Sequence, residues 1–252
     1  MKKLISIVLC VVLALGVLAG CGNTATTDDG AAKEKLVMAT NAAFPPYEFY
    51  ENEKIVGIDA DIAAAIAEKL GMELEIQDTE FGSIITGVQS GKYDIGMAGM
   101  TVTEERKLTV NFSDTYATGI QSVIVKDGSE IKTIEDIEGK KIGVQQDTTG
   151  HIYASDDYGD EAVVPFNKGA DAVAALMSGK VDCVIIDNEP AKSFIAANEG
   201  LVILDSEYAV EDYAICIAKE NTELLDKVNG ALKELIADGT VKTIVDKYIS
   251  AE

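Results

Sequence analysis

Hydrophobic and polar positions follow two different periods along the chain beyond residue 34. Short apolar runs predict strands, and apolar residues spaced by three or four predict helices. The clearest helix lies at 59–72, where Ile62, Ile66 and Leu70 form one apolar face and Gly71 is a stop signal. Further helices are predicted at 82–91, 169–179, 188–198, 221–239 and 240–249. Strands are predicted at 35–40, 73–76, 93–99, 140–145, 161–166, 181–187, 201–205 and 213–219. Because helices separate most of the strands, the pattern predicts an α/β fold with mostly parallel sheets.

One short pattern occurs twice, as SGKYD at 90–94 and as SGKVD at 178–182. Each copy follows a predicted helix and precedes a predicted buried strand, so we expect two lobes that are built alike. The repeat then places Gly99 and Asp187 at equivalent strand ends. Open α/β sheets bind ligands beyond the carboxyl ends of their strands, so these two ends predict a site between the lobes.

The first residues have the pattern of an export signal. A basic MKK precedes an apolar run at 4–20 that leads into Cys21 through LAG, which predicts a lipoprotein signal peptide over 1–21 with lipid on the Cys21 thiol. An uncleaved anchor is the alternative, because about 17–20 apolar residues can span a bilayer. Either one tethers the chain to the cell membrane on its extracytoplasmic face. Residues 22–33 are polar and low in complexity, and they predict a flexible linker.

Composition excludes several partners. The 252 residues are 47% hydrophobic, enough for real cores, and 43 acidic residues against 21 basic ones give a net charge of -22. Phosphate backbones would repel such a chain, so no nucleic acid partner is expected.

Cys183 and Cys216 lie in apolar runs and are predicted to be buried free thiols, although a disulfide between them stays open. With His151 as the only histidine, the sequence predicts no zinc site and no cofactor.

Arg106 is the only arginine in the sequence. Its planar guanidinium can donate two parallel hydrogen bonds to a carboxylate, which a lysine cannot do. Thr101 and a predicted helical turn near Thr103 lie beside it and favour an anion. Asp187 on the other lobe supplies the opposite charge, so the two lobes together match the two ends of a free α-amino acid. The alternative is that Arg106 pairs with a glutamate of its own segment, at 104 or 105, on a solvated face.

Six stretches carry a resemblance to a known family: TNAAFPPYEF (40–49), VGIDADIAAAIAEKLG (56–71), SGKYDIGMAGMTVTEERKLTVNFSDTY (90–116), IEGKKIGVQQDTTG (137–150), GKVDCVIIDNEPA (179–191) and ADGTVKTI (237–244). Over about residues 35–249 the chain resembles the polar amino acid-binding proteins of ABC importers. The resemblance implies a two-lobed periplasmic-binding-protein type II fold, with two mixed sheets flanked by helices and joined by two hinge strands. Lobe one would comprise 34–118 and 214–252, and lobe two 119–213, with crossings near 118–123 and 211–215.

The resemblance also implies roles for individual residues at the amino-acid end of the ligand. Arg106 would grip the α-carboxylate, with help from the hydroxyl and N–H of Thr101. The carbonyl of Gly99 would face the ammonium group, and Asp187 would pair with it.

Other positions that match the family lie around the rest of the ligand. Thr148 and Thr149 would close over the carboxylate from the second lobe, Phe44 and Phe81 would sandwich the side chain, and Asn41 would lie at the end of its pocket. Each has a simpler explanation: phenylalanines are usually core residues, the threonines could cap a helix, and Asn41 could be a turn residue before two prolines.

Two residues depart from the family pattern. Asp147 stands where many relatives have glycine, and its charge could disfavour the ligand carboxylate. Asn41 stands where several relatives have aspartate, and an amide both donates and accepts, so it does not select charge. Glu80, Glu189 and Tyr213 are further candidates for the pocket without a defined position.

The resemblance thus implies a monomeric receptor, not an enzyme, that binds a free L-amino acid with a polar or basic side chain. It would deliver the ligand to an ABC permease with its ATPase. One alternative is an enzyme similar to the cyclohexadienyl dehydratases of this fold, with Glu80 or Glu189 as general acid. The other is a ligand sensor that acts through a partner.

Overall fold

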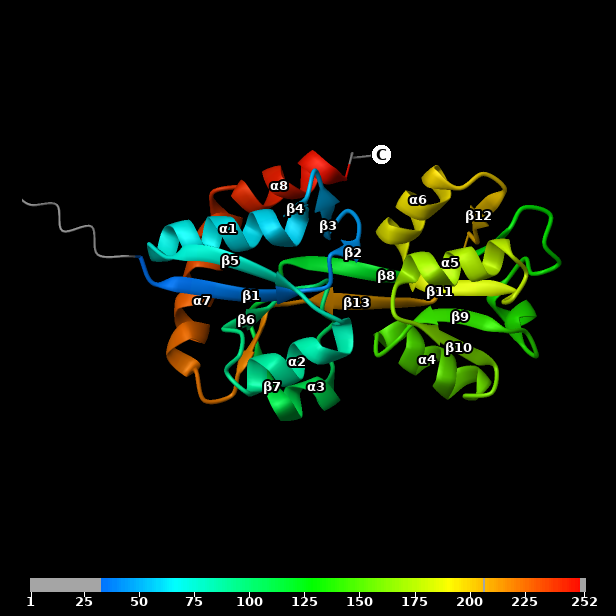
Figure 1. Cartoon of the computed structure of the whole chain (residues 1–252), viewed down its shortest axis with the longest axis horizontal. Coiled ribbons are helices and arrows are strands. Elements are labelled where there is room, and N and C mark those ends of the chain that lie inside the picture. Colours follow the sequence, from blue (N-terminus) through cyan, green and yellow to red (C-terminus); the bar gives the residue numbers. More distant parts are fainter. Residues whose placement is uncertain (1–32, 206, 250–252) are drawn as a thin grey trace, which may run out of the picture. The chain divides into compact units, whose positions relative to one another are not determined.

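The computed structural model describes residues 33–205 and 207–249. The predicted signal peptide at 1–21, the predicted lipid site at Cys21 and nearly all of the predicted linker lie outside the described residues. Within the described part, no helix combines the length and the hydropathy needed to cross a membrane. The described elements form two larger sheets with their own helices and one small sheet (Figure 1).

The first sheet has the strand order β5-β1-β6-β14-β7. Its strands are β1 (Lys35–Thr40), β5 (Glu73–Asp78), β6 (Ile95–Gly96), β7 (Val110–Phe112) and β14 (Cys216–Ala218). The associated helices are α1 (Ile58–Leu70), α2 (Phe81–Gln89), α3 (Glu104–Thr109), α7 (Thr222–Ala237) and α8 (Thr240–Tyr248). β5, β1 and β6 are parallel, whereas β14 runs antiparallel to both of its neighbours.

The second sheet has the order β10-β9-β11-β8-β12, and β13 also pairs with β8. Its strands are β8 (Ala117–Lys126), β9 (Ile142–Gln145), β10 (Val163–Phe166), β11 (Cys183–Asp187), β12 (Leu201–Ile203) and β13 (Ala209–Tyr213). Its helices are α4 (Thr149–Tyr158), α5 (Gly169–Met177), α6 (Asn188–Ala197) and a 3₁₀ turn, η1 (Ile134–Ile137). Both sheets are therefore mixed, each with a parallel half of three strands, where the hydrophobic pattern alone predicts mostly parallel strands.

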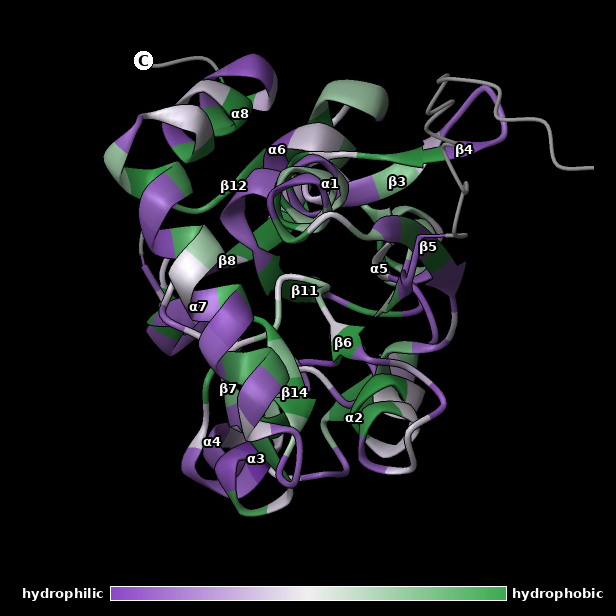
Figure 2. Cartoon of the chain, turned by 90° about the vertical axis from the view of Figure 1, so that its left-hand side faces the viewer, coloured by the Kyte–Doolittle hydropathy of each residue, from purple (hydrophilic) through white to green (hydrophobic). Residues whose placement is uncertain are grey.

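The strongly periodic segments form the predicted helices. In α1, Ile58, Ile62 and Ile66 are fully buried, and Gly71 ends the helix in the left-handed conformation with φ 71°. Helix α7 carries hydrophobic and hydrophilic residues on different faces (Figure 2), and its buried face includes Val228 and Leu232. These faces pack on the first sheet and exclude water from its core.

The short repeat has the same backbone geometry in both copies. Ser90 and Ser178 end α2 and α5 with φ −80° in each case, and the glycine that follows each has φ 74°. The aspartate of each copy then accepts a backbone N–H at the neighbouring strand, at 2.7 Å for Asp94 and 2.8 Å for Asp182. The prediction of two lobes built alike is confirmed, because each repeat leads into a strand between one parallel and one antiparallel neighbour.

Two strands connect the sheets side by side, as Figure 1 shows. β8 pairs with β13 antiparallel from Ala117 opposite Tyr213 to Gln121 opposite Ala209. Gly119 lies within this ladder, and a Cβ there would lie 2.1 Å from the Tyr213 hydroxyl, so only glycine fits.

A small antiparallel sheet is not predicted by the sequence pattern. It consists of β2 (Ala43–Phe44), β3 (Glu48–Glu51) and β4 (Lys54–Val56), and it pairs Phe44 with Glu48. Cys183 and Cys216 are buried free thiols on β11 and β14, as predicted.

Candidate ligand site

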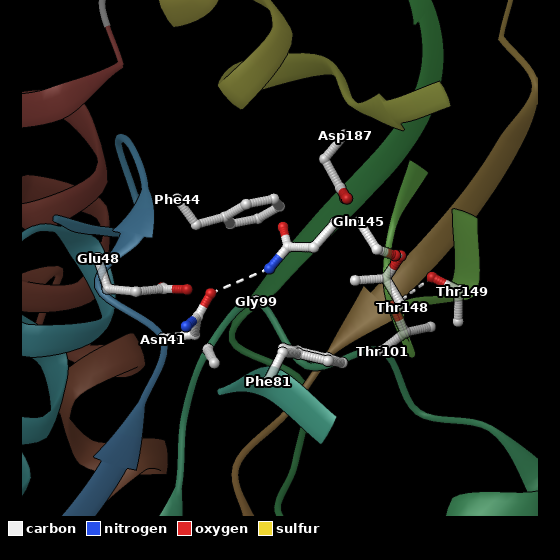
Figure 3. A pocket seen from close by; sticks show the side chains of 11 residues that line it. Asn41, Phe44, Glu48, Phe81, Gly99, Thr101, Gln145, Thr148, Thr149 and Asp187 are labelled. Carbon is white, nitrogen blue, oxygen red and sulfur yellow. Dashed lines mark hydrogen bonds between the residues drawn. The ribbon is translucent and has the colours of Figure 1, made fainter. Parts of the chain in front are cut away.

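A small inner cavity lies where strands of the two larger sheets end (Figure 3). It is lined by Asn41, Phe44, Glu48, Phe81, Ala98, Gly99, Thr101, Gln145, Thr148, Thr149 and Asp187. All the predicted ligand-binding residues except Arg106 are among them. The cavity volume is about 10 Å³, close to the space that one water molecule needs.

The lining residues come from equivalent places in the two sheets. Asn41 directly follows β1, and Gly99 and Thr101 follow β6. Gln145 and Asp187 are the last residues of β9 and β11. The cavity therefore lies at the carboxyl ends of the parallel strands, which is where open α/β sheets bind ligands.

Two aromatic rings form opposite walls of the inner cavity. Phe44 is 7% exposed, and Phe81 is the first residue of α2. Figure 3 shows the two rings on either side of a hydrogen bond between Gln145 and Asn41. Gly99 has φ 52°, and a Cβ there would lie 3.0 Å from the Phe44 ring, so a glycine lets the ring approach the chain.

Hydrogen bonds join the two sides of the cavity. Gln145 Nε2 donates to Asn41 Oδ1 at 3.0 Å, and the hydroxyls of Thr101 and Thr149 are 3.3 Å apart. Asn41 in turn donates its Nδ2 to a backbone carbonyl at 2.7 Å, which fixes its oxygen as an acceptor toward the cavity. An occupant of the cavity has to replace the Gln145–Asn41 bond, because the volume left beside it is so small.

Arg106 lies behind the wall of the inner cavity. Its Nη1 donates to the carbonyl of Thr101 at 2.8 Å, and its Nη2 donates across to the carbonyl of Asp147 at 3.2 Å. The guanidinium carbon lies 5.3 Å from the centre of the Phe81 ring. Burial lowers the pKa of Arg106, and the charge of Glu211 opposes that shift.

Arg106 faces a second, outer cavity of about 370 Å³. This outer cavity is lined by Phe81, Gly82, Ile85, Met100, Thr103, Glu105, Arg106, Thr109, Asp147, His151 and Ile152. Asp147 has φ 64°, and its backbone N–H donates to Nδ1 of His151 at 3.2 Å. The Asp147 side chain thus lines the outer cavity and lies against Gly82, where a Cβ would come within 2.2 Å of its carboxylate.

Asp187, which is predicted to bind the ligand ammonium, belongs to a buried acidic cluster. Gln121 Nε2 donates to Asp187 Oδ2 at 2.8 Å and to Glu211 Oε2 at 2.9 Å. Burial raises the pKa of Asp187 well above its ordinary value, and the charge of Glu211 raises it further. Asp187 Oδ1 has no hydrogen-bond donor among the described residues, so it can accept one from an occupant of the cavity. Sequence reasoning missed Gln121 and Glu211, although polar residues inside the two crossing segments were a signal.

Glu48 and Gln145 are the lining residues with functional side chains that sequence reasoning missed. Glu48 is 1% exposed, lies opposite Phe44 in the small sheet and reaches the cavity from β3. Burial raises its pKa well above the ordinary value. The signal in the sequence was an acidic residue inside the otherwise apolar stretch FPPYEFY.

The other candidates without a defined position do not line the inner cavity. Tyr213 is fully buried and packs edge-on against Tyr47, with ring centres 5.3 Å apart. Glu189 forms an ion pair with Lys192 at 3.0 Å, and Glu80 precedes α2.

A fold of two similar α/β lobes, joined by two crossing strands with a polar cavity between them, defines a two-lobed solute-binding protein. The profile of the family described as bacterial extracellular solute-binding proteins, family 3, matches residues 36–251. The chain belongs to this family, and it is a binding protein rather than an enzyme. The relatives named below are binding proteins, so they do not favour the dehydratase alternative.

Named relatives are similar along the whole chain. The arginine-binding extracellular protein ArtP of Bacillus subtilis (strain 168) is 35% identical and covers 100% of both chains. The arginine-, lysine-, histidine-binding protein ArtJ from Geobacillus stearothermophilus has a TM-score of 0.83 at 35% identity, covering 87% of this chain and 96% of its own. An ancestral arginine-binding protein bound to glutamine has a TM-score of 0.83 at 40% identity, covering 87% of this chain and 99% of its own.

Proposed function

We propose that this chain is the receptor of an ABC importer for a free L-amino acid with a cationic side chain, with arginine as the first candidate. The observation that carries this proposal is the chemistry at the Asn41 end of the inner cavity. There Asn41 Oδ1 is an acceptor that a fixed N–H donor of Gln145 occupies, and the buried carboxyl of Glu48 lies in the same wall. A guanidinium, which offers five N–H donors and a positive charge, matches this end better than a neutral side chain does.

The opposite end of the cavity suits the groups that all free amino acids share. Asp187 Oδ1 would accept from the ligand ammonium, together with the carbonyl of Gly99. The carboxylate would lie against the hydroxyls of Thr101 and Thr149 and the start of α4, where backbone N–H groups favour an anion. Arg106 would donate to the same carboxylate, which requires its guanidinium to exchange its present carbonyl partners for the ligand.

The methylene stem of a long side chain would pass between the two aromatic rings. Phe44 and Phe81 offer apolar surface to the stem and the negative faces of their rings to a cation. Phe81, which begins α2, lines the cavity and also packs against a hydrophobic core cluster, and the core contact supports the ring at the cavity wall.

Ligand binding would be coupled to closure of the two lobes, which we take as 34–118 with 214–252 and as 119–213. The ligand would replace the Gln145–Asn41 bond and the carbonyl partners of Arg106, and it would contact both lobes at once. A ligand that binds the closed form better shifts the population toward it. β8 and β13 are the two segments about which the lobes would turn, and the permease with its ATPase would recognise the closed form.

We further propose that the receptor is a monomer held at the extracytoplasmic face of the membrane by lipid on Cys21. Removal of residues 1–21 as a signal peptide would leave residues 22–33 as the tether. Mass spectrometry of the membrane-bound chain tests this point: a diacylglyceryl mass on Cys21 supports it, and an intact N-terminus contradicts it.

A thermal-shift panel tests the receptor function. The chain from residue 22 onward would be unfolded, dialysed and refolded to remove bound ligand, and then tested with all standard L-amino acids, cystine and prephenate. A ligand at 100 times its Kd stabilises by about 2.7 kcal/mol, roughly 5–10 °C for a chain of this size. We expect this shift with arginine and a smaller one with lysine. A shift with prephenate alone, or no shift with any amino acid, would contradict the proposal.

A further inference from the structure

Two buried carboxyl groups meet beside the inner cavity. Asp59, in the first turn of α1, is fully buried, and its Oδ2 accepts the N–H of Gly99 at 2.8 Å and the hydroxyl of Tyr116 at 2.9 Å. Its other oxygen, Oδ1, and Oε2 of Glu48 have no N–H or O–H donor among the described residues. The two carboxyl groups lie beside each other, and the charge of Asp59 raises the pKa of Glu48.

Such a pair needs a proton, because an ionised carboxylate only accepts hydrogen bonds. Burial of Asp59 raises its pKa to about 6, although its two hydrogen-bond donors favour the charged form and oppose this shift. Glu48 has a pKa far above its ordinary value because of burial and the negative charge of Asp59. The proton therefore belongs to Glu48, and the charge belongs to Asp59.

The charged groups that act most strongly on Glu48 supply no positive charge to replace that proton. The titratable groups around Glu48 and its partner come from several elements: Asp59 on α1, Asp78 at the end of β5, Asp187 at the end of β11, and the phenols of Tyr47 and Tyr116. Each of these is an acid or a phenol. Figure 3 shows the Glu48 side chain extending toward the side of the cavity where Asn41 and Phe44 lie, so a cation that binds there would place a positive charge beside Glu48. The charge of Arg106 acts on Asp187 and is not among the strongest influences on Glu48.

We propose that Glu48 and Asp59 form a proton-exchange site, in which binding of a cationic side chain against Glu48 releases one proton to the solvent. This inference rests on the proposed function. The O–H bond of the Glu48 carboxyl breaks, the proton passes to water or buffer, and the carboxylate that remains pairs with the ligand cation. The total charge of the site is then the same before and after binding.

The same device distinguishes ligands by charge. A neutral ligand such as citrulline, which has a carbonyl oxygen in place of one arginine nitrogen, accepts a hydrogen bond from protonated Glu48 and releases no proton from it. Any proton that the common ammonium group displaces from Asp187 is released with both ligands. The ratio of arginine affinity to citrulline affinity should consequently rise about tenfold for each unit of increasing pH while Glu48 in the free receptor stays protonated. Through Asp59, the exchange also acts on Gly99 in the cavity wall and on Tyr116, next to the crossing strand β8.

Calorimetric titration in buffers of different ionisation enthalpy tests the proposal. The chain from residue 22 onward would be titrated at pH 7 with L-arginine and with L-citrulline, in phosphate, MOPS and Tris. We expect the buffer dependence of the arginine enthalpy to exceed that of the citrulline enthalpy by the amount that corresponds to release of one proton. Glu48→Gln and Asp59→Asn should each abolish this excess, the first because no proton is present and the second because an amide donor leaves Glu48 ionised. Glu51→Gln, an exposed residue of the same strand, is the matched control and should keep the excess.

The outcomes separate the two levels of the account. Tight arginine binding with the same buffer dependence as citrulline overturns the proton exchange and leaves the proposed function intact. An excess of the arginine slope over the citrulline slope that persists in both variants also overturns it, because the proton then comes from another group. Failure of the unmodified chain to bind arginine overturns the proposed function and the exchange together. If a variant does not fold, the slope of the unmodified chain decides alone.

Discussion

The two ends of the inner cavity are built on different principles. At one end Thr101, Thr149 and Asp187 lie near strand ends and a helix start. Backbone groups and one carboxylate there would contact the amino and carboxyl groups of the ligand, which are the same in every amino acid. At the other end Asn41 and Glu48 present side-chain oxygens, one bonded to the Gln145 amide and one in a carboxyl group whose pKa is raised by burial and by Asp59. The first end, which we call the shared end, suits the amino and carboxyl groups common to all amino acids. At the second end, which we call the selective end, the side-chain oxygens can exchange their hydrogen-bond partners, and we expect the choice of ligand to be made there.

The largest effect is expected at the shared end, from Asp187→Asn. Truncating one partner of a buried charge pair costs about 2–5 kcal/mol, so arginine affinity should fall on the order of 100-fold or more. Calorimetry should show a similar loss for every amino acid that binds. The matched control is 5-guanidinopentanoate, which is arginine without the ammonium group and should bind both proteins alike. An equal loss for this compound would contradict the pairing of Asp187 with the ammonium.

Arg106→Lys should have the next largest effect. The ammonium of lysine cannot reproduce two parallel hydrogen bonds to a carboxylate, so arginine affinity should fall about 10- to 100-fold, or about 1.5–3 kcal/mol. Agmatine, which lacks the carboxylate, should bind the variant and the parent equally, and Lys107→Arg on the exposed side of α3 should change nothing. Unchanged arginine affinity in Arg106→Lys would mean that Arg106 only supports Thr101 and Asp147 from behind.

At the selective end, Glu48→Gln should change preference more than overall affinity. The amide cannot become a carboxylate, so arginine should bind about tenfold more weakly and citrulline about as well as before. The ratio of the two dissociation constants is the quantity to measure. Equal losses for both ligands would show that Glu48 shapes the cavity without reading the charge.

The smallest effects should have opposite signs at the two ends. Thr149→Val removes a hydroxyl that we expect to hold the ligand carboxylate, so affinity should fall. Gln145→Ala removes a bond that the ligand has to replace, so affinity should rise. Each hydrogen bond is worth about 0.5–1.5 kcal/mol net, which is roughly 2- to 10-fold in Kd. If Gln145→Ala lowers the affinity as Thr149→Val does, then Gln145 contacts the ligand directly.

Much of the fold could be predicted because its long elements have a clear period. The stripe of Ile62 and Ile66 predicts α1, and the spacing of the SGK repeat predicts Gly99 and Asp187 at matching strand ends. Asp187 is the last residue of β11, whereas β6 already ends at Gly96 and Gly99 lies in the segment that follows it. The residues of the shared end could be predicted for the same reason, because they lie next to regular strands and helices. Arg106 was recognised as special by its uniqueness, but the pattern could not show that its guanidinium would bond to two carbonyls behind the cavity wall.

The selective end could not be predicted, for two physical reasons. The strands β2, β3 and β4 have two to four residues each, too few for an alternating pattern, and it is their register that sets Glu48 opposite Phe44. Asp59 had a sufficient local explanation, because an acidic residue in the first turn of a helix is stabilised by the helix dipole. That explanation gave no sign of its burial against Glu48, which depends on the packing of α1 on the small sheet.

The most direct test of the central claim is a pair of calorimetric titrations on ligand-free protein, one with L-arginine and one with L-citrulline. The two ligands have nearly the same shape and share both α-groups, so they differ only at the Glu48 end of the cavity. The account predicts that arginine binds at least about 100-fold more tightly, which corresponds to about 2.7 kcal/mol of charge recognition. Equal affinities, or tighter binding of citrulline, would contradict a receptor that selects a cationic side chain.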